Sequence, residues 1–168
     1  ERMDLSAFYN PAYYLKALGG ADKVTTYVSL APLWRGSFTS ETAPLPTAYR
    51  DLLGDGNLPI CAACGQQAPN SPVGQVIWRG GSPYVDGIHY TNISTRYDEL
   101  VVPYTSGQVA GRPGQHVTNI VVQDGCAADR SDHLAIAGSR RTTRMVLNAL
   151  DPQHPVPVPC EYVPPFTG

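Results

Sequence analysis

Three short β-rich runs, with a helical pattern before the first and after the last, constrain the fold of this 168-residue chain most strongly. The runs cover residues 24–30, 88–95 and 117–123. Val, Ile, Thr and Tyr dominate them, and these residues favour strands. The helical patterns cover residues 7–18, ahead of Gly19-Gly20, and 139–150, which opens on a serine and ends before Asp151-Pro152. This order of elements indicates an α/β sheet, and it corresponds to the second half of one.

Length and composition fit one globular domain. A chain of this length with 42% apolar and 15% charged residues can bury a substantial core. The formal net charge of −2 provides no electrostatic basis for binding nucleic acid or an acidic membrane surface. No apolar run of about 18 residues occurs, so no transmembrane segment is predicted. Within the domain, residues 33–87 are predicted to be a loop-rich insertion with a helix near 71–78, and residues 152–168 an extended, proline-rich tail.

The four cysteines indicate disulfides. An even number of cysteines in a proline-rich, lysine-poor chain favours an oxidising, extracellular compartment. The most direct pairing is Cys61–Cys64 with Cys126–Cys160, although the sequence allows three. The Cys61-x-x-Cys64 spacing also occurs in redox motifs and zinc sites. A redox motif needs a thioredoxin-like strand and helix, and a zinc site needs a second close pair of cysteines, so a structural disulfide is favoured.

A carboxylate and a histidine stand where acid–base chemistry would need them. Asp98 is predicted to end the second strand, and His133 lies in the loop after the third. A carboxylate that orients an imidazole forms two of the three parts of a Ser-His-Asp triad, and in the α/β-hydrolase order the acid precedes the histidine. Glu99 is expected to point away from Asp98 if the strand continues through both residues, and Asp132 is expected to be solvated or to cap its loop.

The remaining polar candidates are expected to be structural. His89 is predicted to be packed within a strand, and His116 and His154 to lie in polar loops. The glycosylation triplet Asn92-Ile93-Ser94 falls inside a predicted strand, so no modification is expected there. A set of large apolar residues fits an acyl pocket or lid as well as it fits ordinary core: Trp34, Phe38, Tyr49, Leu52 and Leu53.

The chain resembles a known family over nearly its whole length. The resemblance is carried by Tyr13-Tyr14-Leu15-Lys16, Leu18-Gly19-Gly20-Ala21-Asp22-Lys23-Val24, Cys61-x-x-Cys64-x-Gln66-Gln67, Tyr90-Thr91-Asn92-Ile93-x-Thr95-Arg96-Tyr97-Asp98-Glu99-Leu100, Asn119-Ile120-x-x-Gln123-Asp124-x-Cys126 and Asp129-x-Ser131-Asp132-His133. These segments resemble the secreted actinobacterial triacylglycerol lipases of the α/β-hydrolase fold, of the Streptomyces and Mycobacterium type. The resemblance implies a mostly parallel sheet with flanking helices, of which this chain is the C-terminal portion. It also implies that Asp98 is the triad acid, that His133 is the triad base and that the cysteines form disulfides.

The nucleophile departs from the family pattern. The family places a Gly-His-Ser-x-Gly elbow shortly before the segment that starts at Pro11. Leu5 stands where the serine is expected, and a gap in the alignment offers Ser6 instead, with Asp4 and Phe8 two residues away on either side. An elbow needs small residues there, because the backbone approaches closely. The family's Asn-His-Gly-Thr is also replaced within residues 33–37, and neither oxyanion N–H is recognisable.

The resemblance implies part of a lipase or carboxylesterase that hydrolyses acyl esters or lipids without a metal or organic cofactor. The nucleophile would then be carried by a companion chain or by a part of the protein that has been cut out or separated. The alternative is a catalytically inactive homologue that acts as a binding or partner subunit. Retention of Asp98 and His133 favours the enzyme, whereas loss of the elbow glycines favours the inactive homologue. A disulfide-rich extracellular module unrelated to hydrolases is a further possibility.

Overall fold

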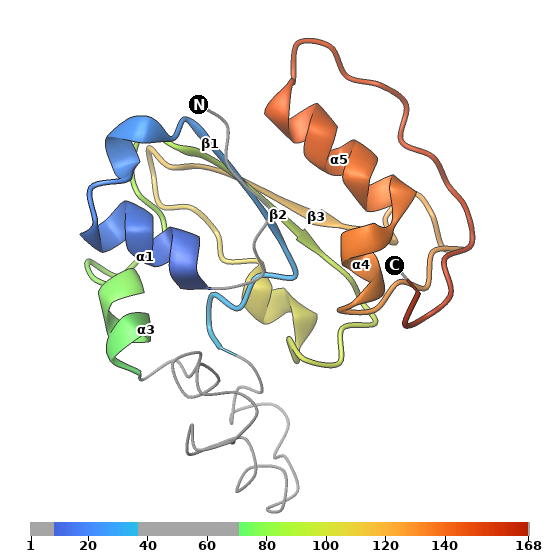
Figure 1. Ribbon diagram of the computed structural model, residues 1–168, viewed down its shortest axis with the longest axis horizontal. Coiled ribbons are helices and arrows are strands. Elements are labelled where there is room, and N and C mark those ends of the chain that lie inside the picture. Colours follow the sequence, from blue (N-terminus) through green and yellow to red (C-terminus); the bar gives the residue numbers. More distant parts are fainter. Residues whose placement is uncertain (1–8, 37–70, 168) are drawn as a thin grey trace, which may run out of the picture.

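Three parallel strands form a sheet in the part of the chain that this computed structural model describes, residues 9–36 and 71–167. They are β1 (Thr26–Leu30), β2 (His89–Ser94) and β3 (His116–Val121), in the order β1-β2-β3. Because β2 pairs with both neighbours, Tyr27, Tyr90 and Val117 stand side by side across the sheet. Figure 1 shows the helices set around these strands. The predicted α/β class, with a parallel sheet and flanking helices, is confirmed.

The helices fall into two groups. The first consists of α1 (Tyr9–Ala17) and α3 (Pro72–Ile77), which pack against each other. The second consists of α4 (Ala135–Gly138) and α5 (Arg140–Leu150), and α5 packs against β1. Two short 3₁₀ turns, η1 (Ala21–Lys23) and η3 (Tyr104–Gly107), complete the helical elements in the described ranges. In Figure 1 the two groups lie well apart, with the strands extending between them.

Serine caps set the start of two helices. The Ser71 hydroxyl accepts a hydrogen bond of 2.9 Å from the Gly74 N–H, and Ser139 accepts one from the N–H three residues further on. Such caps satisfy N–H groups that have no partner within the helix. Helix α5 ends at Leu150, since a residue that precedes proline disfavours helical backbone. The helices predicted over 71–78 and 139–150 are confirmed, as is the described part of the helix over 7–18.

A buried amide organises the core beneath the sheet. Asn92 is fully buried within β2, and its Oδ1 accepts hydrogen bonds from Ser29 Oγ (2.8 Å) and Trp34 Nε1 (2.9 Å). Its Nδ2 donates to Tyr84 Oη and to Asn119 Oδ1, both at 2.8 Å. All four hydrogen-bonding positions of this amide are therefore occupied. Asn92 is inaccessible to glycosylation in this fold, and Trp34 is a core residue.

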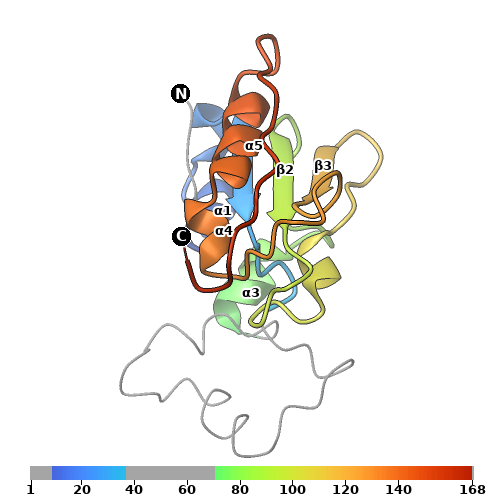
Figure 2. The same ribbon diagram turned by 90° about the vertical axis from the view of Figure 1, so that its right-hand side faces the viewer.

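The tail is extended and is fastened to the rest of the fold. The Cys126–Cys160 disulfide joins it to the loop after β3, which confirms the predicted pairing for these two cysteines. Arg141, buried on α5, donates hydrogen bonds to the backbone carbonyls of Val122, Asp124 and Pro159. Figures 1 and 2 show the tail leaving the far end of α5 and returning beside α4.

Several predictions lie outside the described residues. They concern Ser6, Cys61, Cys64 and the large apolar residues of segment 38–53. Only residues 33–36 and 71–87 of the predicted insertion are described, and they contain α3. Among the helices of the described ranges, none has both the length and the apolar character needed to cross a membrane.

A buried carboxylate–histidine pair as candidate site

Asp98 and His133 come together from two different loops. Strand β2 ends at Ser94, so Asp98 lies in the turn that follows it, and the prediction that Asp98 ends the strand is wrong. Pairing stops there because the chain turns away from the sheet after Thr95. His133 lies in the loop between β3 and α4, as predicted, immediately before Leu134 and the first turn of α4.

The two side chains are bonded to each other and nearly excluded from solvent. His133 Nδ1 lies 2.9 Å from Asp98 Oδ1 and 3.1 Å from Oδ2. The exposed fractions of the two side chains are 7% for the histidine and 1% for the aspartate. Since an ionised carboxylate only accepts hydrogen bonds, the geometry assigns a proton to Nδ1. In the neutral imidazole Nε2 then carries the lone pair that can accept a proton.

The Asp98 carboxylate is itself held in place. Its Oδ1 accepts hydrogen bonds from the backbone N–H groups of Leu100 (3.0 Å) and Val101 (2.7 Å). These two bonds close the turn that contains Asp98, and they fix the direction in which the carboxylate faces. The aspartate therefore presents a preorganised acceptor to the imidazole, and the ring orientation does not depend on His133 alone.

The environment raises the pKa of His133. Burial is the largest influence and lowers the pKa, because it disfavours the charged imidazolium. The hydrogen bond and the negative charge of Asp98 act in the opposite direction, with smaller help from the charges of Glu99 and Asp132. Together these carboxylates outweigh burial, so the imidazolium is stabilised relative to a free histidine.

Glu99 does not point away from the pair as expected. Its Oε2 accepts a hydrogen bond of 3.1 Å from the backbone N–H of His133. The expectation relied on the alternation of side chains along a strand, and the strand has already ended at Ser94. Two adjacent carboxylates therefore hold His133: Asp98 binds the imidazole ring, and Glu99 binds the backbone N–H.

Asp132 caps its loop, as one of the two expectations stated, but it is buried rather than solvated. Only 3% of Asp132 is exposed. Its Oδ1 accepts hydrogen bonds from the N–H groups of Leu134 (3.1 Å) and Ala135 (2.9 Å) at the start of α4. Its Oδ2 accepts one from the Phe166 N–H in the tail, at 2.7 Å.

A further network of buried polar side chains supports the loop that carries His133, and the sequence analysis did not predict it. Gln123 Nε2 donates to Thr95 Oγ1 (2.9 Å), and Thr95 Oγ1 donates to the carbonyl of Ser131. Asp129, fully buried, accepts hydrogen bonds from both the N–H and the hydroxyl of Ser131. The segments after β2 and β3 are thereby joined two residues before His133. Thr95 and Gln123 are the last residues of two predicted strands, and no sequence signal marked their hydrogen-bond partners.

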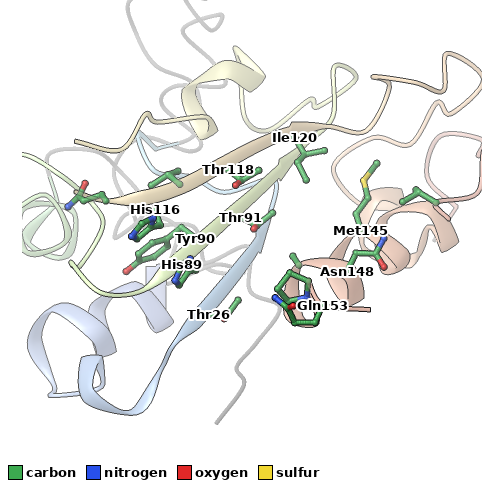
Figure 3. Close-up of a pocket in the computed structure, with 15 residues that line it drawn as sticks. Thr26, His89, Tyr90, Thr91, His116, Thr118, Ile120, Met145, Asn148 and Gln153 are labelled. Atoms are coloured by element: carbon green, nitrogen blue, oxygen red, sulfur yellow. The ribbon is translucent and has the colours of Figure 1, made fainter. Parts of the chain in front are cut away.

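The other histidines lie away from the pair. His89 and His116 are register partners at the first positions of β2 and β3, and their rings stack with centroids 4.7 Å apart. His89 lies in a strand, as predicted, but it is exposed and not packed in the core. His116 is the first residue of β3, so the expectation that it lies in a loop is wrong. The two histidines line a pocket of about 900 Å³ between the sheet and α5, together with Thr91, Thr118 and Met145, as Figure 3 shows. His154 is exposed and lies 3.1 Å from Asp151.

The described residues contain no metal-binding cluster. Among them, no group of three or more His, Cys, Asp or Glu side chains is placed to hold a metal ion. In the pair, the hydrogen bond to the Asp98 carboxylate occupies His133 Nδ1, so the chemistry open to the pair is proton transfer at Nε2.

Comparison with protein-family models and with curated proteins gave no match. The likeness to the actinobacterial lipases therefore stays a prediction from the residues quoted above.

Proposed function

We propose that this chain supplies the acid and the base of a serine hydrolase that acts on acyl esters, of the lipase or carboxylesterase type. The observation that carries the proposal is the buried contact of 2.9 Å between His133 Nδ1 and Asp98 Oδ1. A carboxylate bound at Nδ1 fixes the tautomer that leaves Nε2 free to act as a general base. The parallel sheet with flanking helices is compatible with part of an α/β-hydrolase, secreted in keeping with its disulfide.

In the proposed reaction, His133 Nε2 takes the proton from a serine hydroxyl as the serine oxygen attacks the ester carbonyl carbon. Asp98 stabilises the resulting imidazolium. When the tetrahedral intermediate collapses, the imidazolium gives its proton to the departing alcohol and an acyl-enzyme remains. Water, deprotonated by the same Nε2, then releases the acid and regenerates the serine. The serine belongs to a companion chain, to a separated part of the protein, or to the residues outside the described ranges, where Ser6 is a weak candidate because it lacks the small neighbours of an elbow.

The surroundings of the pair favour an apolar acyl group. Three apolar side chains borne by the segments that hold the pair are substantially exposed: Leu100 (39%), Leu134 (62%) and Phe166 (72%). Leu134 directly follows His133, and the Phe166 backbone is bonded to Asp132. Exposed apolar side chains on these segments suit hydrocarbon chains better than charged substrates.

The second candidate is an inactive homologue that binds a lipid or a partner protein. The observation that favours it is the sequence from Asp4 to Phe8, where Leu5 stands in place of the nucleophile and the elbow glycines are missing. A folded protein that binds an acyl ligand without turnover would support this candidate.

The two candidates are separated by hydrolysis of a chromogenic acyl ester, measured on protein purified from its natural source together with any companion chain. His133→Ala should lower kcat/KM by about 100-fold or more, since a general base contributes that much to such reactions. His154→Ala is the matched control, because His154 also contacts an aspartate through Nδ1 but is exposed. Equal activity in the two variants would exclude the proposed role of His133.

A further inference from the structure

The aspartate next to the candidate base joins the tail to the loop that carries the base. Asp132 Oδ1 caps the N–H groups of the two residues that follow His133, and Oδ2 accepts the Phe166 N–H at 2.7 Å. Both oxygens of this buried carboxylate are therefore engaged, each by a different part of the chain. We propose that Asp132 and the tail segment 163–166, named here the tail clamp, position His133; this role rests on the proposed function.

The conformation of Phe166 indicates what holds the clamp. Phe166 has a φ of +57°, a left-handed conformation that costs energy in a residue other than glycine. Its side chain is 72% exposed, so packing of the ring does not compensate for that cost. The hydrogen bond from its N–H to the Asp132 carboxylate does, with help from the bond between Thr167 Oγ1 and the Pro164 carbonyl (2.7 Å). The left-handed conformation of Phe166 therefore directs its N–H toward the Asp132 carboxylate.

The second half of the tail, residues 160–166, is attached to the loop at three places. The Val163 carbonyl accepts a hydrogen bond of 3.0 Å from the Arg130 N–H, within an isolated parallel bridge between Asp129 and Val163. Earlier in both segments, the Cys126–Cys160 disulfide joins them covalently. Figure 2 shows the tail running down toward α4, where the loop carrying His133 ends. The bond between Phe166 and Asp132 is thus the last of three attachments between the tail and this loop, and it lies next in sequence to His133.

These contacts restrain His133 at three points. Asp98 holds the ring, Glu99 holds the backbone N–H, and Asp132 holds the backbone immediately after it. Asp132 touches neither the ring nor any reacting atom, so it is a positioning residue and not a catalytic residue. Without the tail bond, Oδ2 would be free to hydrate and the carboxylate to rotate, which would weaken the two caps and loosen the backbone of His133.

The test uses a variant that lacks the donor and a matched variant that keeps it. Shortening the chain after Pro165 removes the Phe166 N–H but leaves the charge of Asp132 and the disulfide in place. Phe166→Gly removes the exposed ring and retains both the N–H and a residue suited to positive φ. Two readouts by NMR are independent of any nucleophile: hydrogen exchange of the Leu134 and Ala135 amides, and the low-field signal of the His133 Nδ1 proton.

Loss of one charge-assisted hydrogen bond should accelerate exchange of both amides by about tenfold in the shortened chain and broaden the Nδ1 proton signal. Phe166→Gly should leave both readouts unchanged. Asp132→Asn, which keeps one cap oxygen but loses the acceptor for the tail, provides the second variant should the shortened chain unfold. Its Leu134 and Ala135 amides should exchange as in the shortened chain, and amide exchange is the readout for this variant because the substitution also removes a charge that acts on His133. Unchanged readouts in the shortened chain, unchanged amide exchange in folded Asp132→Asn, or equal changes in Phe166→Gly, would overturn the clamp. A failed clamp leaves the His133→Ala hydrolysis result untouched, so the two proposals can fail separately.

Discussion

Replacing Asp98 by asparagine should reverse the direction in which the pKa of His133 is displaced. The substitution preserves the shape of the side chain and an oxygen able to accept from Nδ1, but it removes the negative charge. In the wild type the hydrogen bond and charge of Asp98 are the main opposition to burial, which is the largest influence on this histidine. With the charge gone and the hydrogen bond reduced to a neutral one, burial should prevail, and the pKa of His133 should fall below the ordinary histidine value of about 6.5.

The size of the fall follows from the geometry of the pair. Hydrogen bonds to a charged group contribute about 1.5–3 kcal/mol, and the side chains here are 7% and 1% exposed, so solvent screens the interaction little. Loss of an interaction of this size should lower the pKa of His133 by an amount that a titration resolves, since one pH unit corresponds to about 1.4 kcal/mol. The measurement is an NMR titration of the His133 ring between pH 4 and 9.

Glu99→Gln is the matched control for this titration. Glu99 is adjacent in sequence and raises the pKa of His133 through charge alone, while its hydrogen bond reaches the backbone and not the ring. The decrease in the pKa should therefore be clearly smaller than in Asp98→Asn. An unchanged or higher pKa in Asp98→Asn, or an equal decrease in Glu99→Gln, would refute the assignment of Asp98 as the ring's partner.

Further predictions concern stability. Because the pKa of His133 is raised on folding, protonation of His133 stabilises the fold below the unfolded pKa of about 6.5, and this stabilisation should be lost as pH rises through the folded pKa. Urea unfolding at a series of pH values should show this loss, and the His133→Ala variant should lack it. Replacing Cys126 and Cys160 together by serine should lower the free energy of unfolding by about 4 kcal/mol, since the disulfide joins residues separated by 34 positions in the sequence, and an unchanged melting temperature would contradict this. Asp129→Ala should cost about 2 kcal/mol in denaturant unfolding, because it leaves a buried N–H and a buried hydroxyl without their acceptor, and a cost near zero would show that the loop does not depend on them.

The elements of the fold could be predicted because their signals are local. β-branched runs marked the three strands within about two residues, and Ser139 marked the start of α5 because its hydroxyl satisfies a free helix N–H. The order of strands in a parallel sheet then brought the loops after β2 and β3 together. Asp98 and His133 could thus be proposed as neighbours without knowledge of their exact turns.

The contacts that hold the pair could not be predicted because they join residues far apart in the chain. The sequence around Asp132 does not indicate that its carboxylate accepts a hydrogen bond from a residue 34 positions later in the tail. The hydrogen bond from the His133 N–H to Glu99 forms because β2 ends before Glu99. Likewise, the sequence does not distinguish Asn92 from any other polar residue of a strand, because its four hydrogen-bond partners come from separate segments of the chain. Side-chain alternation predicts faces only while a strand continues.

The most direct test of the central claim is labelling with a serine-directed fluorophosphonate, followed by intact-mass and peptide mass spectrometry of protein from its natural source. The proposal predicts one labelled serine, on this chain outside the described ranges or on a companion chain, and loss of labelling in His133→Ala but not in His154→Ala. A folded protein that takes no label, or that labels equally with and without His133, would contradict the assignment of Asp98 and His133 to a hydrolase and would favour the binding role.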